Sequence, residues 1–179
     1  MTNSTVSGNS ASDNGGGIFN GGTATVTNST VSGNSANDGG GINNFGTATL
    51  SNSLISGNSA ATSGNEVFNA SSSIINADAN NLFGDSSQTN AQAFSNFTPG
   101  ANDINATSDG TNTALSDILD PAGLADNGGL TETIALSPNS PAIDAGNNSL
   151  IPPDAFDLDS DGDTTEPILT PGAKEGISE

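Results

Sequence analysis

Apolar residues alternate with threonine or serine in short runs that recur along the first part of the chain. In the run Thr-Ala-Thr-Val-Thr at 23–27, the alternation places alanine and valine on one face of an extended segment and the threonines on the other. The run 47–51 repeats this pattern, and two further runs in each period carry one apolar residue each. The pattern predicts three short strands in each period, with the inward-facing residues Val6, Ile18, Ala24, Val26, Val31, Ile42, Ala48, Leu50, Ile55 and Val67.

The runs belong to a sequence repeat. The block Asn-Ser-Thr-Val-Ser-Gly-Asn-Ser-Ala occupies 3–11, recurs unchanged at 28–36, and returns with two substitutions at 52–60. A fixed period of 24 or 25 residues indicates stacked units that cannot bury their apolar face alone. Because each strand would pair with its counterpart one period later, we expect an all-β parallel β-helix in which Asn34 and Asn58 stack at a corner.

The repeat weakens after residue 69, although 71–84 still reads as a strand, a turn and a strand. We expect repeat coils of the β-helix over 1–84 and an acidic, partly disordered tail over 150–179. The stretch 85–149 of the same domain would contain an irregular insertion at 85–120, with a short helix at 114–119, a last strand at 130–136 and a compact closing loop around Pro138 and Pro141.

Composition limits the partners of this chain. It holds twenty acidic residues against one base, Lys174, which gives a net charge of −19. Nucleic acid is excluded as a partner because phosphate binding needs clustered lysine and arginine, and anionic membrane surfaces are excluded in the same way. No apolar run approaches transmembrane length, so we expect no membrane insertion. Met1 leads at once into repeat sequence without a signal peptide, so we expect a fragment of a longer protein.

Two features of the sequence resemble known families. The recurring Gly-Gly-Ile and Asn-Ser-Thr-Val-Ser-Gly-Asn segments resemble the right-handed parallel β-helix proteins of bacterial surfaces. Leu-Ala-Asp-Asn-Gly-Gly-Leu-Thr at 124–131 and Ser-Pro-Asn-Ser-Pro-Ala-Ile-Asp-Ala-Gly at 137–146 resemble the end of the choice-of-anchor Q domain, which is similar to polymorphic outer-membrane and autotransporter-like β-helices. The resemblance implies a right-handed β-helix, an extracellular or cell-surface location, and no assigned catalysis.

A run of alternate carboxylates in the tail is the sharpest local motif. Calcium prefers several oxygen ligands, and alternate acids before a glycine turn resemble the first half of an EF-hand loop. Ile168 stands where the closing bidentate glutamate would be, so we expect any calcium site to be weak; the alternative is a solvated acidic tail. The candidate ligands are Asp157, Asp159, Asp161, Asp163 and Glu166.

The residues leave two classes of function open. The first is a non-enzymatic structural or adhesion module that binds glycans or partner proteins along a β-helix face, with Phe19 and Phe45 near the turns. The alternative is a carbohydrate-active β-helix enzyme, a polysaccharide lyase or glycosidase, or its inactive relative. Catalysis is disfavoured because the chain has no arginine, histidine or cysteine. An open strand edge at the first coil would also invite end-to-end self-association.

Overall fold

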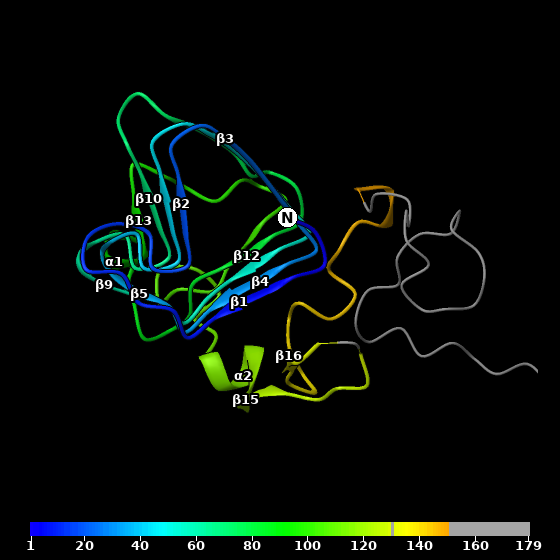
Figure 1. Cartoon of the computed structure of the whole chain (residues 1–179). Coiled ribbons are helices and arrows are strands. Elements are labelled where there is room, and N and C mark those ends of the chain that lie inside the picture. The colour runs from blue at the N-terminus through cyan, green and yellow to red at the C-terminus, as the bar shows by residue number, and fades with distance from the viewer. Residues whose placement is uncertain (130, 151–179) are drawn as a thin grey trace, which may run out of the picture.

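The computed structural model describes residues 1–129 and 131–150. It is a nearly all-β parallel solenoid of about four turns, with three sheets that run along the stack (Figure 1). The parallel β-helix predicted from the repeat is therefore confirmed.

Three parallel sheets form the walls of the solenoid. The longest consists of β1 (Thr5–Ser7), β4 (Thr30–Ser32), β8 (Leu54–Ile55), β12 (Leu82–Phe83) and β14 (Ile104–Asn105). The second consists of β2 (Ile18–Asn20), β6 (Ile42–Asn44), β10 (Val67–Asn69) and β13 (Phe94–Ser95). The third stops one coil earlier and consists of β3 (Thr23–Thr27), β7 (Thr47–Ser51) and β11 (Ile74–Asn76). A small fourth sheet, which the sequence pattern did not reveal, pairs β5 (Ser35–Asp38) with β9 (Ser59–Ser63).

Strand register follows the sequence period. Val31 lies between Val6 on one side and Ile55 on the other, and Ala24 pairs with Ala48. The matching positions of the repeat are thus neighbours in space, as the period requires.

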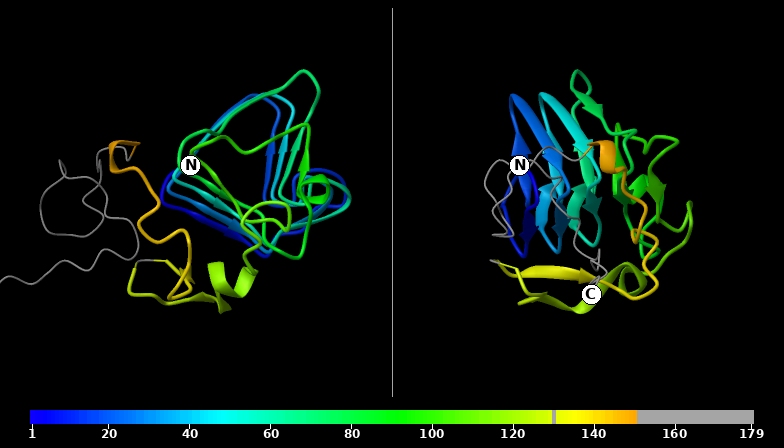
Figure 2. Two further views of the ribbon diagram at one scale, coloured as in Figure 1. Left: turned by 180° about the vertical axis from the view of Figure 1, so that it is seen from behind. Right: turned by 90° about the vertical axis from the view of Figure 1, so that its right-hand side faces the viewer.

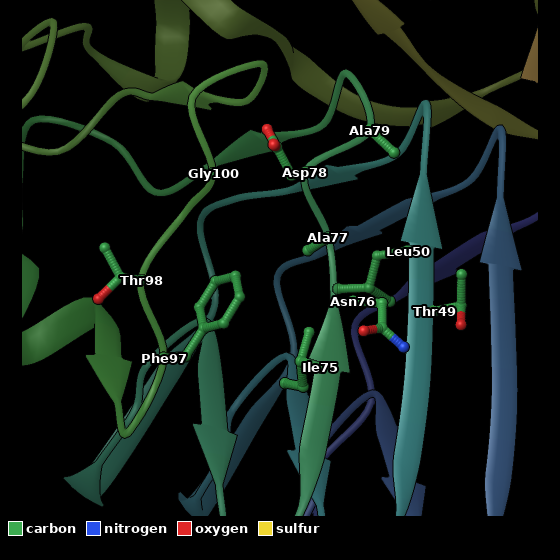
Figure 3. A pocket seen from close by; sticks show the side chains of 10 residues that line it. All are labelled: Thr49, Leu50, Ile75, Asn76, Ala77, Asp78, Ala79, Phe97, Thr98 and Gly100. Carbon is green, nitrogen blue, oxygen red and sulfur yellow. The ribbon is translucent and has the colours of Figure 1, made fainter.

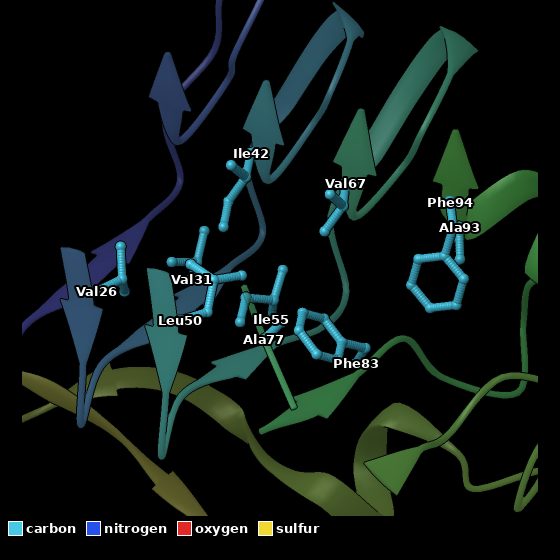
Figure 4. Close-up of a cluster of buried hydrophobic side chains, with 10 residues drawn as sticks. All are labelled: Val26, Val31, Ile42, Leu50, Ile55, Val67, Ala77, Phe83, Ala93 and Phe94. Atoms are coloured by element: carbon cyan, nitrogen blue, oxygen red, sulfur yellow. The ribbon is translucent and has the colours of Figure 1, made fainter. Parts of the chain in front are cut away.

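The core is a narrow column of small and branched side chains inside the coils (Figure 4). Seven of the ten predicted inward residues are buried: Val26, Val31, Ile42, Ala48, Leu50, Ile55 and Val67. The other three, Val6, Ile18 and Ala24, are only half-buried. They belong to the first coil, which has a neighbouring coil on one side only.

Glycine and asparagine make the corners of each coil. Gly39 has a φ of 65°, a left-handed conformation that glycine adopts without steric cost. At the next position, a side chain on Gly40 would clash with the Ser59 carbonyl of the following coil. Asn28 and Asn52, at equivalent positions, have φ values of 49° and 48°. The Gly-Gly-Gly and Asn-Ser segments of the repeat are therefore required by turn geometry and by close stacking.

The stretch 85–120 is more regular than the irregular insertion predicted from the sequence. It contains α1 (Asn90–Ala93) and supplies β13 and β14, so two of the three sheets continue into a fourth turn. The sequence pattern missed these strands because each is only two residues long, which is too short to show alternation. The short helix expected at 114–119 is present as α2 (Leu115–Ile118).

A C-terminal closing region leaves the solenoid and packs against its side (Figure 2). It consists of an antiparallel pair, β15 (Leu119–Ala125) and β16 (Thr133–Leu136), a closing loop, and the 3-10 turn Asn148–Leu150. The loop is held at the corners of the coils: Asn52 exchanges two hydrogen bonds with the main chain of Asn147, each 2.9 Å, and Asn80 donates to the Ala145 carbonyl. The predicted acidic tail lies outside the described residues apart from Leu150.

Candidate binding surface

Three phenylalanine rings form an aromatic stripe on the outside of the solenoid. Phe19 lies on β2, Phe68 on β10, and Phe45 directly follows β6 between them. The ring centroids are 5.8 Å apart for Phe19 and Phe45, and 6.1 Å apart for Phe45 and Phe68. Phe19 is 57% exposed and Phe45 is 50% exposed. The stripe thus runs along the solenoid axis with its rings open to solvent.

An asparagine ladder fixes the backbone that carries the aromatic stripe. Asn20 donates its side-chain amide to Asn44 at 2.7 Å, and Asn44 donates to Asn69 at 2.8 Å. Asn69 in turn donates to the Asn96 carbonyl of the fourth coil. All three side chains are buried, so each hydrogen bond is protected from water. The stripe therefore stands on a pre-organised scaffold.

A second ladder runs through the neighbouring corner and ends on a carboxyl group. Asn9 donates to Asn34 and Asn34 donates to Asn58, each at 3.0 Å, which confirms the predicted stacking. Asn58 then donates to Glu66 Oε2 at 2.6 Å. Gln88 closes the network with hydrogen bonds from its Nε2 to Glu66 Oε1 and to Asp85 Oδ2.

Glu66 is the titratable group that this network isolates. Its side chain is fully buried, and burial raises its pKa from 4.5 to about 8 even though the hydrogen bonds from Asn58 and Gln88 favour the ionised form. Asp85 nearby acts in the same direction as burial. The Glu66 side chain has no exposure to solvent, and its hydrogen bonds join the third coil to the fourth.

A crevice opens in the side of the solenoid where the third sheet ends. It has a volume of about 430 Å³ and lies between the strand β11 and the segment 97–100 (Figure 3). Ile75 and Phe97 lie on its opposite walls, with Leu50 and Ala77 at its base. Thr49, Asn76, Asp78 and Thr98 give it a polar rim.

Asp13 and Asp38 are the only acidic residues before Glu66 in the sequence. Asp13 and Asp38 lie on adjacent coils, where the Asp38 amide donates to the Asp13 carbonyl and the Ser63 hydroxyl donates to Asp38 Oδ1 at 2.6 Å. Residues 1–129 and 131–150 hold no cluster of three acids that could ligate a metal. The predicted calcium ligands, Asp157, Asp159, Asp161, Asp163 and Glu166, lie outside the described residues, so the calcium site stays a prediction.

Sequence reasoning found part of the aromatic stripe and missed the other features. It identified Phe19 and Phe45 near the turns, and both are exposed. It did not include Phe68, although this residue follows the third Ile18-type position just as Phe19 follows the first. This position in the repeat could have identified Phe68 from the sequence. Glu66 stands out in the sequence because it replaces the glycine that precedes Ile18 and Ile42, but the pattern did not indicate that it is buried. Nothing in the pattern marked Phe97, which lies beyond the repeat.

Comparisons with known proteins add no function. The chain matches no family, no curated protein and no solved structure. No family match supports the resemblance to a choice-of-anchor Q domain. Among the described residues, no helix has the length and apolar character needed to span a membrane.

Proposed function

We propose that this chain is a non-enzymatic structural or adhesion module of an extracellular or cell-surface protein, and that it binds neutral glycans along the aromatic stripe of Phe19, Phe45 and Phe68. The observation that carries the proposal is the row of partly exposed rings on a rigid wall. Exposed aromatic rings offer apolar faces to ligands, and here they bind at low entropic cost because their backbone is already fixed.

The charge and shape of the chain favour this class of ligand. A net charge of −19 repels polyanionic polysaccharides, so a neutral chain is the better partner. The three rings follow the solenoid axis, and a linear polymer that lies along them would contact several rings at once. Weak contacts at several points add up to useful avidity.

The surface location rests on the resemblance of 124–131 and 137–146 to the end of the choice-of-anchor Q domain. In this chain the first segment begins with the last two residues of β15, and the second forms the closing loop. We propose that the closing region terminates the β-helix of a surface protein.

Binding to a panel of soluble neutral polysaccharides tests the glycan proposal. We expect Phe45→Ala to weaken binding about tenfold or more, because it removes the middle ring of the stripe. Leu124→Ala is the matched control: Leu124 is 46% exposed but lies on β15, away from the stripe. Equal loss in both variants, or no binding by the wild-type chain, would reject the proposal.

The carbohydrate-active alternative makes a different prediction. A glycosidase needs two accessible carboxyl groups, one with a raised pKa. Glu66 has the raised pKa but is fully buried. Reproducible cleavage of a polysaccharide, lost when Asp13 or Asp38 is changed to asparagine, would favour this alternative.

Self-association through the first coil is a further proposal. The outer edges of β1 and β2 have no strand partner among the described residues, whereas residues 1–3 pair with the outer edge of β3. Unpaired strand edges favour pairing with another chain. Analytical ultracentrifugation should therefore show association that increases with concentration, and a strict monomer at high concentration would exclude it.

A further inference from the structure

The third sheet has three strands, against four in the second and five in the longest, and its last strand has an open edge. β11 pairs with β7 on one side, and no described strand pairs with its other side. The segment 97–100 passes the place where the next strand would lie, but it contains Pro99, which has no N–H to donate. This segment therefore leaves the crevice between itself and β11 instead of continuing the sheet.

The main chain of Ile75 faces this crevice. The Ile74 amide donates to the Gly46 carbonyl of the preceding coil. Because the polar groups of successive strand residues point to opposite sides, the N–H and C=O of Ile75 point away from β7. Neither group has a hydrogen-bond partner within residues 1–129 and 131–150. One donor and one acceptor are thus presented at strand spacing along an open edge.

The crevice walls suit an alternating peptide. Its base reaches the core at Leu50, because β11 is shorter than β7 and leaves this residue without a strand neighbour on that side. Phe97 forms the facing wall. An apolar side chain that entered here would contact Leu50, Ile75 and Phe97, and its two neighbours along the peptide would point outward to the polar rim.

The negative charge at the crevice favours a basic peptide. Asp78 is exposed at the rim of the crevice, and the described residues include no lysine or arginine. The Asp78 carboxylate accepts a hydrogen bond from the Asn102 amide at 2.7 Å, which holds it in place. A cationic residue next to the inserted strand is therefore favoured and an anionic one is repelled.

We propose that the crevice binds an extended, basic peptide segment of a partner protein, which adds as a strand to the open edge of β11. This site is separate from the aromatic stripe and does not depend on glycan binding. A second copy is disfavoured as the occupant, because it would bring another chain with a net charge of −19 against the exposed Asp78.

The test uses the full chain and a fluorescent probe peptide, Lys-Thr-Ala-Thr-Val-Thr-Lys, which carries the β3 sequence between two lysines. Ile75→Pro removes the outward N–H, whereas the matched variant Ile75→Ala removes the same side chain and keeps that N–H. Both variants lose the contact of the Ile75 side chain with the peptide, so we expect both to bind more weakly than the wild-type chain, and the proline variant to bind about tenfold more weakly than the alanine variant. Equal Kd values for the two variants would overturn the proposal.

A second measurement keeps the proposal testable if the proline variant fails to fold. Amide exchange of Ile75 in the wild-type chain should slow when the probe is added. It should stay fast with the same peptide flanked by two glutamates, and Asp78→Asn should reduce this charge preference. An Ile75 amide already protected in the free chain at every concentration would mean that another part of this chain fills the crevice. Protection that grows with protein concentration would mean a second copy. Either result would overturn the proposal.

Discussion

The stacked coils and the closing region satisfy their polar groups in different ways. In the coils, a residue such as Asn34 finds its partners one period before and one period after itself, at Asn9 and Asn58. In the closing region, Asn147 is held by Asn52, which lies 95 residues away in the sequence. Because the sequence repeats, each residue of a coil contacts the equivalent residue of the next coil, which we call the neighbour rule. The same corner structure therefore recurs in each coil. The closing region has no such rule, and each of its contacts is used once.

The rule changes within the stack, at the junction of the third and fourth coils. The ladder that begins at Asn9 ends on Glu66 instead of a further asparagine. Beyond it, aromatic packing replaces small residues: the Phe83 ring makes edge contacts with Phe94 and Phe97, at centroid distances of 6.2 and 5.0 Å. We therefore expect the largest energetic effects at this junction.

The first prediction concerns Phe83, which is fully buried at the junction. Phe83→Ala should lower the free energy of unfolding by about 3–5 kcal/mol, because it leaves a cavity where the coils meet the fourth turn. Urea denaturation measures the change. Phe45→Ala, which removes an exposed ring, should change stability by no more than about 0.5 kcal/mol. Similar losses in the two variants would remove the distinction between junction and surface.

The second prediction concerns the pH dependence caused by Glu66. In the unfolded chain this carboxyl group ionises near its ordinary pKa of 4.5, whereas in the folded chain its pKa is about 8. Between these values the folded state binds more protons, so stability falls as pH rises, by at most about 1.4 kcal/mol per pH unit. Below pH 4.5 and above pH 8 this group adds no pH dependence.

Comparison with Glu66→Gln isolates this effect from the other acids of the chain. The variant should gain stability relative to the wild-type chain by about 2 kcal/mol between pH 5 and pH 7. Urea denaturation at several pH values gives the difference. Parallel curves for the two proteins would mean that Glu66 ionises in the folded chain with an ordinary pKa.

The third prediction tests the neighbour rule inside the coils. Asn34→Ala should lower the free energy of unfolding by about 2 kcal/mol, because it removes the side-chain amide that donates to the Val6 carbonyl and to Asn58 Oδ1 inside the stack. Asn9→Ala, at the exposed start of the same ladder, should cost less than about 1 kcal/mol. If the two losses were equal, position within the stack would not matter.

The smallest effect is expected in the closing region. Asn52→Gly removes both hydrogen bonds to Asn147, which are exposed to solvent, and glycine tolerates the left-handed φ of 48° at this position. Global stability should fall by less than about 1 kcal/mol, while amide exchange in the closing loop becomes faster. Slower folding or global destabilisation as large as that of Asn34→Ala would show that the closing loop belongs to the same cooperative unit as the ladder.

Much of the coil region could be predicted from the sequence, because residues one repeat period apart in the sequence are neighbours in space there. The period alone placed Val31 between Val6 and Ile55, and stacked Asn34 on Asn58. The sequence did not determine whether Phe19 is exposed, because a ring near a turn can pack inward or outward with the same sequence. The fourth turn was missed because β13 and β14 are too short to carry a pattern.

The repeat by itself determined the solenoid, because identical segments at a fixed spacing can bury their apolar side chains only by lying on one another. Tertiary structure decided where that rule stops. It buried Glu66 between Asn58 of the repeat and Gln88 of the stretch after it, and it left the edge of β11 open where Pro99 cannot extend the sheet. Both features arise from contacts between repeating and non-repeating segments, and such contacts leave no periodic signal in the sequence.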